Sequence, residues 1–100
     1  MQIVKSASAG TMESSDIMVT LHPNPGQGIE IDLESPVKAQ FGDAILETAR
    51  NTLHRFGVTD ARLELRDRGA LDCVIAARIQ CAVFRAAGVP YDWSKEDTPV

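Results

Sequence analysis

Two segments in the first half of the chain alternate between apolar and polar residues, which is the period of a half-buried β-strand. The first covers residues 16–22 and the second covers residues 29–34, where every second residue is apolar and the residues between them are acidic. The sequence PNPGQG at 23–28 separates the two segments and is typical of a turn. We therefore expect the two strands to pair as a hairpin.

Apolar residues then recur every three or four positions, as they do in an amphipathic helix. Ser35 and Pro36 predict the start of this helix as its N-cap and first-turn proline. Gly57 predicts its end, with Val58 placed to contact Leu53 in a Schellman motif. The expected inward residues are Val37, Phe41, Ile45, Ala49, Leu53 and Phe56.

A third alternating segment, residues 61–66, predicts a further strand whose outward residues include Arg62 and Arg66. These arginines are expected to pair across the sheet with the acids at 30, 32 and 34.

A second helix is predicted over residues 70–87, ending at Gly88, and few of its residues are charged. Its apolar residues form two stripes. One contains Leu71, Ile75, Ile79, Ala82 and Val83, and the other contains Cys73, Val74, Ala77, Cys81 and Phe84. The second stripe is covered either by the rest of the domain or by another subunit, and Arg78 and Arg85 lie at a boundary between the stripes.

These elements predict a single small α+β domain, in which an antiparallel sheet of three or four strands packs against two long helices in the order β-β-α-β-α. Residues 1–15 are expected to be a mobile lead-in with a short edge strand at Gln2–Lys5. Residues 16–88 form the expected folded core, and residues 89–100 an irregular tail.

Composition narrows the class of protein. Hydrophobic residues make up 44% of 100 residues and charged residues 24%, so the chain is expected to fold as one domain. The net charge of −4 argues against nucleic acid as a partner. No apolar run is long enough for a signal peptide or a membrane span, and we expect a cytoplasmic protein that does not associate with membranes. Cys73 and Cys81 are expected to be reduced packing residues.

The usual catalytic patterns are missing from the sequence. His22 and His54 are isolated, and no His or Cys cluster has metal-ligand spacing. The acids at 16, 30, 32 and 34 lack the loop geometry of a cation site and fit a solvated strand face. We therefore expect no metal, and no catalytic residue that would make the chain an enzyme by itself.

The segment from Gly10 to Asp16 is harder to explain by structure alone. It places Ser14 and Ser15 between acids, in a stretch of small residues just before a strand. One interpretation is a polar loop whose serines bond to the local backbone. The other is a modification site, because an exposed loop can enter the active site of another enzyme at small cost.

The sequences AGTMESSD and ELRDRGALDCVIAARIQ, together with the order of elements, resemble the citrate lyase acyl carrier proteins, the gamma subunits of citrate lyase. The resemblance covers most of residues 4–87. It implies that Ser14 carries phosphoribosyl-dephospho-coenzyme A through a phosphodiester, with Glu13, Ser15 and Asp16 as recognition context for the transferase that attaches it.

The same resemblance implies the partners and the reaction. The alpha subunit would exchange acetyl for citryl on the thiol of the prosthetic group, and the beta subunit would cleave the citryl thioester, so that citrate becomes acetate and oxaloacetate. A carrier of this kind needs no catalytic residue of its own.

Two other classes remain open on the residues alone. The chain could be a non-covalent interaction or regulatory subunit, or a small enzyme whose sites are built across the interfaces of a homo-oligomer.

Overall fold

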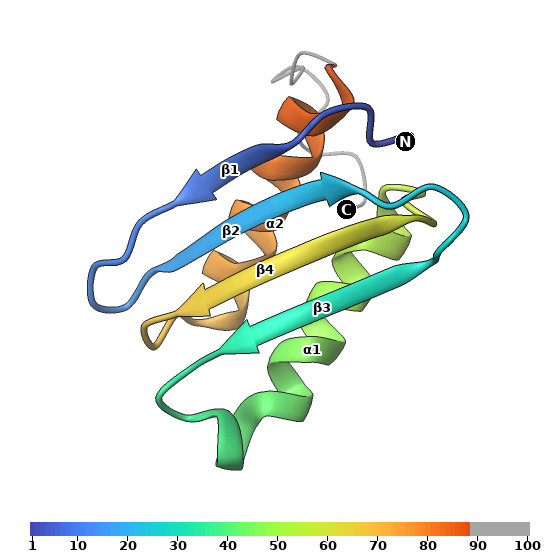
Figure 1. The fold of residues 1–100 in the computed structure, drawn as a ribbon. Helices are drawn as coiled ribbons and strands as arrows, with labels where there is room; N and C mark the ends of the chain where they lie inside the picture. Colours follow the sequence, from blue (N-terminus) through green and yellow to red (C-terminus); the bar gives the residue numbers. More distant parts are fainter. Residues whose placement is uncertain (89–100) are drawn as a thin grey trace.

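One four-stranded sheet and two helices make up the fold, which a computed structural model describes for residues 1–88. The elements are β1 (Ala7–Gly10), β2 (Ile17–Pro23), β3 (Ile29–Glu34), α1 (Lys38–Arg55), β4 (Ala61–Asp67) and α2 (Asp72–Ala87). The strand order is β1-β2-β4-β3, and both helices lie on the same face of the sheet (Figure 1). The predicted α+β class is confirmed, while the predicted irregular tail at 89–100 lies outside the described residues.

The predicted hairpin of β2 and β3 is wrong, because β4 lies between these two strands. β4 pairs antiparallel with β2 and parallel with β3, so the sheet is mixed instead of antiparallel. α1 provides the long connection that a parallel pair requires. The arrangement places the arginine-bearing strand β4 beside the acidic strand β3, and Arg66 contacts Asp32 at 3.1 Å, which confirms the predicted cross-strand pairing at this position.

The lead-in contains more regular structure than the sequence indicated. The edge strand is β1, which pairs antiparallel with β2, and not the expected segment Gln2–Lys5. Ile3 and Ala9 are both buried in the hydrophobic core. Small residues with little periodicity concealed this strand, because only one of its side chains points fully inward.

The end of α1 follows the prediction. Gly57 has a φ of 69°, its amide donates to the carbonyl of His54, and the amide of Val58 donates to the carbonyl of Leu53 at 3.0 Å. These are the two hydrogen bonds of a Schellman motif. The start of the helix differs from the prediction, because the residue before its first turn is Val37. The hydroxyl of Ser35 accepts from the amide of Val37 at 3.2 Å, so Ser35 caps the turn that leads into α1 and not the first turn of the helix itself.

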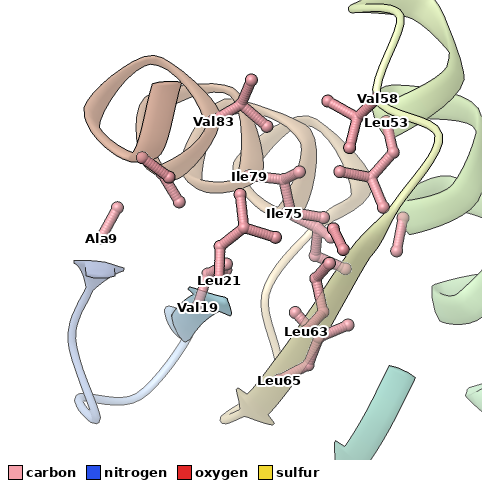
Figure 2. Close-up of a cluster of buried hydrophobic side chains, with 14 of the residues drawn as sticks. Ala9, Val19, Leu21, Leu53, Val58, Leu63, Leu65, Ile75, Ile79 and Val83 are labelled. Atoms are coloured by element: carbon pink, nitrogen blue, oxygen red, sulfur yellow. The ribbon is translucent and has the colours of Figure 1, made fainter. Parts of the chain in front are cut away.

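The core lies between the helices and the sheet (Figure 2). Most of the first apolar stripe of α2 is fully buried there, where α2 packs against β1 and β2. Leu71, assigned to the same stripe, is 70% exposed because it precedes the first turn of α2. Phe41 of α1 was also expected to point inward and is 56% exposed, while Gly42 occupies the buried position beside it.

The second stripe of α2 is partly covered by α1. The ring of Phe84 meets Phe56 edge to face at a centroid distance of 5.6 Å, and Cys81 packs against the core. Cys73 is exposed, so its predicted packing role is wrong, and both cysteines are free thiols.

Neither α1 nor α2, the two helices within residues 1–88, combines the length and hydropathy of a membrane span.

Candidate functional site

The serines singled out in the sequence lie in the tight loop that joins β1 to β2. The amide of Asp16 donates to the carbonyl of Glu13 at 3.2 Å, which closes a four-residue turn with Ser14 and Ser15 at its centre. Ser15 has a φ of 66°, and it is the one non-glycine residue with positive φ in the described part of the chain. A positive φ at the third position is characteristic of type II turns and is unfavourable for a residue other than glycine.

Ser14 occupies the corner of this turn and is exposed to solvent. Within residues 1–88 its hydroxyl group has no hydrogen-bond partner. Its neighbours are also exposed, since Glu13 and Ser15 point into solvent on either side. The hydroxyl of Ser14 is therefore accessible to a modifying enzyme and can react there as a nucleophile.

Asp16 turns inward from the same loop, and its carboxylate accepts four hydrogen bonds. Arg78 of α2 donates from Nε at 3.0 Å and from Nη2 at 2.9 Å, one bond to each carboxylate oxygen. The hydroxyl of Thr11 and the amide of Ile17 each donate at 2.7 Å. Because Arg78 and then Thr11 and the Ile17 amide stabilise the charged form, the pKa of Asp16 falls from 3.8 to about 2.

Two backbone hydrogen bonds tie the loop to the end of β4. The amide of Ser15 donates to the carbonyl of Arg68 at 2.7 Å, and the amide of Arg68 donates to the carbonyl of Asp16 at 2.9 Å. They extend the antiparallel pairing of β2 and β4 beyond its last residue pair, Ile17 and Asp67. The second half of the loop, Ser15 and Asp16, is thus hydrogen-bonded to the residue that follows β4.

Gly10 makes the close approach of the two strands possible at the base of the loop. It has a φ of +99°, and a Cβ atom built there would lie 1.8 Å from the carbonyl oxygen of Ile17 and 3.4 Å from Cδ of Arg78. No other residue fits this position without moving the backbone.

Sequence reasoning found the serines and Asp16, and it missed Thr11 and Arg78 as parts of the site. Arg78 did give a signal, as one of the few charged residues in a strongly apolar helix. Its partner could not be identified from the sequence, because Asp16 lies 62 residues earlier in the chain.

The isolated histidines prove to have different surroundings. His22 lies on the open face of the sheet, where its Nδ1 is 2.7 Å from the hydroxyl of Ser6 and its Nε2 is 2.5 Å from a carboxylate oxygen of Glu64. This hydrogen bond holds the pKa of Glu64 below its usual value. His54 is exposed on α1.

The acidic residues of β3 and the cavity described below lie apart from the serine loop. Asp32 and Glu34 pair with Arg66 and Arg68, and no cluster that could hold a metal ion occurs among the described residues. A cavity of about 440 Å³ is lined by residues 1–3, 24–26, 57, 59 and 60. It lies where β2 ends and β4 begins, which is the opposite end of the sheet from Ser14.

The fold is a mixed four-stranded sheet with two helices on one face and an exposed serine turn, and comparison with known families assigns the chain to the acyl carrier class. The family model described as ACP, malonate decarboxylase delta subunit (MdcD), matches residues 4–86. The chain is also 50% identical over 99 residues to the citrate lyase acyl carrier protein of Streptococcus equi subsp. equi, covering 98% of this chain and 97% of the relative.

Two further citrate lyase acyl carrier proteins show similar agreement. That of Escherichia fergusonii is 54% identical over 87 residues, with 87% of this chain and 90% of the relative covered, and that of Clostridium perfringens is 49% identical over 94 residues, with 93% of each covered. The chain therefore belongs to the citrate lyase acyl carrier protein family, whose members it matches at about 50% identity, and it also matches the acyl carrier family model described above.

A solved structure shows the same fold. A chain in the crystal structure of a Pseudomonas malonate decarboxylase hetero-tetramer in complex with malonate superposes with a TM-score of 0.54 at 19% identity, over 84% of this chain and 86% of that one. Membership of an acyl carrier family, which rests on the family model and the curated relatives, implies a covalently attached prosthetic group.

Proposed function

We propose that this chain is the acyl carrier subunit of a citrate lyase and that Ser14 is the residue to which its prosthetic group, phosphoribosyl-dephospho-coenzyme A, is attached. In this role it carries acetyl and citryl groups while citrate is cleaved to acetate and oxaloacetate. The observation that carries the proposal is the exposed, unpartnered hydroxyl of Ser14 at the corner of an anchored turn. The names of the relatives support the choice of complex.

The surroundings of Ser14 fit an anionic phosphodiester. The carboxylate two residues away, Asp16, is already paired with the guanidinium of Arg78, so its charge is compensated. Glu13 is exposed and can turn its carboxylate into solvent. When bound, the group supplies the thiol to which an acyl group is linked.

Attachment is a phosphoryl transfer in which the Ser14 oxygen is the nucleophile. Its Oγ forms a bond to phosphorus of an activated donor, a phosphoric anhydride of the prosthetic group. The anhydride P–O bond breaks, the leaving phosphate departs with the electron pair, and the hydroxyl proton passes to a base of the transferase or to water. The transferase supplies the catalysis, and this chain supplies an accessible oxygen on an anchored turn, which the transferase aligns for in-line attack.

The remainder of the domain acts as a non-catalytic support. A tethered thiol has a raised effective concentration at every active site within its reach, so one carrier can serve two catalytic subunits. The proposed partners are the citrate lyase alpha subunit, which transfers the acyl group, the beta subunit, which cleaves the citryl group, and the transferase that attaches the prosthetic group.

The proposal is tested by expressing the wild-type chain, Ser14→Ala and Ser15→Gly with the transferase and the enzymes that make its donor. We expect wild type and Ser15→Gly to gain a mass of coenzyme size and to restore citrate cleavage with alpha and beta subunits. Ser14→Ala should do neither. Glycine is the control at position 15 because it adopts the φ of 66° found there without strain.

Addition of the mass to Ser14→Ala would show that the attachment site is another residue. A wild-type chain that stays bare under the same conditions would contradict the carrier proposal and favour a non-covalent or regulatory subunit.

A further inference from the structure

We propose that Arg78 is a positioning residue for attachment of the prosthetic group, because it fixes, through Asp16, the turn that presents Ser14 to the transferase. This inference rests on the proposed attachment at Ser14. Arg78 itself belongs to α2 and lies 64 positions after that serine, so no local pattern links the two residues.

The contact between Arg78 and Asp16 has the geometry of a clamp. The guanidinium engages both carboxylate oxygens, at 3.0 and 2.9 Å, while the side chain of Asp16 is only 13% exposed. Two-point pairing fixes the orientation of the carboxylate as well as its distance, which a lysine ammonium does not do. The clamp therefore sets the direction in which the chain leaves the turn.

The remaining contacts of Asp16 pass this constraint to the rest of the turn. Its carboxylate also accepts from Thr11 at 2.7 Å, and the hydroxyl of Thr11 in turn accepts from the amide of Glu13 at 3.2 Å. One side chain of α2 thus restrains the residue before Ser14 as well as the residue two positions after it. Ser14 has no such restraint of its own among residues 1–88, so its position depends on these neighbours.

The strands at the base of the loop leave room for the arginine. Cδ of Arg78 would lie 3.4 Å from a Cβ atom at Gly10, which places the aliphatic part of the side chain directly against the backbone of β1. The strain at Ser15, with its φ of 66°, is the second sign that the turn is held in a set shape and is not free to relax.

Positioning has a chemical consequence for the transfer step. In-line attack requires the Ser14 oxygen to lie opposite the leaving group, and small misplacements of a reacting atom cost large factors in rate. Loss of the clamp is expected to let the turn sample other shapes, so a smaller fraction of encounters with the transferase presents the hydroxyl correctly.

The experiment compares Arg78→Gln, Arg78→Lys and Arg85→Gln in the full-length chain. Arg85 is the matched control, since it lies two turns further along α2 and donates to the backbone carbonyl of Ser8 at 2.7 Å instead of to the loop. Two quantities are measured: amide hydrogen exchange across residues 11–16, and the initial rate of mass addition by the transferase at saturating donor.

We expect Arg78→Gln to exchange faster in the loop and to be modified about ten- to a hundredfold more slowly. Arg78→Lys should be intermediate, since it keeps the charge and loses the two-point contact. Arg85→Gln should match wild type in both measurements. Asp16→Asn removes the same clamp without changing α2. It is expected to show the same faster exchange and slower modification, and it keeps the test decisive if Arg78→Gln folds poorly.

Wild-type modification rates in both Arg78→Gln and Asp16→Asn would overturn the inference. So would a slow Arg78→Gln with a fully protected loop, because this result would mean that Arg78 contacts the donor or the transferase directly. Failure of the proposed attachment site is recognised separately, by a bare wild-type chain or by mass added to Ser14→Ala.

Discussion

Asp16 is a half-buried residue that supports the serine turn and belongs to the sequence motif around Ser14. Four donors surround its carboxylate, and the resulting stabilisation of the charged form lowers its pKa to about 2. In the unfolded chain these donors are absent and the carboxyl group has an ordinary pKa. Folding is therefore linked to the ionisation of this residue.

This linkage predicts the direction of a pH effect. Above pH 3.8 Asp16 is charged in both states and the clamp contributes fully to stability, and the contribution declines as the pH falls from about 4 to about 2, where the folded state also takes up the proton. Asp16→Asn should therefore lose stability at pH 6 and show a shallower decline over this range. Urea denaturation at a series of pH values measures both effects.

Asp43→Asn, on the exposed side of α1, is the matched control and should keep the wild-type pH dependence. An Asp16→Asn variant whose stability declines as steeply as that of wild type between pH 4 and 2 would contradict the assigned role of the carboxylate.

Gly10 provides a second prediction at this scale. Gly10→Ala combines a left-handed backbone with a contact of 1.8 Å to the carbonyl oxygen of Ile17, and we expect it to lower the free energy of unfolding by about 2 kcal/mol or more. Gly26→Ala has a φ of +71° with nothing within 4 Å, so it should cost about 1 kcal/mol. Chemical denaturation of both variants makes the comparison, and equal costs would show that the contact is relieved without strain.

At the scale of elements, residues that were assigned to one apolar stripe of the second helix differ widely in burial. Ile79 is fully buried and Leu71 is 70% exposed, although both were assigned to the same stripe. Ile79→Ala should lower the free energy of unfolding by about 3 kcal/mol through a core cavity, while Leu71→Ala should change it by less than about 0.5 kcal/mol. Denaturation midpoints of the two variants test this, and similar losses would mean that Leu71 is covered in solution.

The C-terminal ends of the two helices were more predictable than the set of residues that each helix turns toward the core. The Schellman ending at Gly57 and the stop at Gly88 depend on a few adjacent residues, so local rules suffice. The exposure of Phe41 depends on which face of α1 is turned toward the core, where Gly42 takes the buried position, and the spacing of apolar residues alone does not fix that rotation.

Strand pairing was beyond the reach of local rules for a similar reason. The turn at 23–28 and the alternation on either side are compatible with a hairpin. They are equally compatible with a loop that passes the end of β4, and only the completed sheet decides between them.

At the scale of the whole molecule, the proposed attachment site lies at one end of the sheet. The serine turn precedes β2, and the antiparallel pairing brings it to the end of β4 and close to α2. The serines could be predicted from sequence, because the motif around them resembles a known family. The clamp could not, because it joins residues 62 positions apart that meet only after the sheet and α2 have formed.

The most direct measurement is tandem mass spectrometry of the modified wild-type chain after digestion with trypsin. Cleavage at Lys5 and Lys38 releases residues 6–38, which contain serines at 6, 8, 14, 15 and 35. We expect one prosthetic group per chain, localised to Ser14, with the other four serines bare. Localisation to any of those four, or a bare peptide after exposure to the transferase and its donor, would contradict the central proposal.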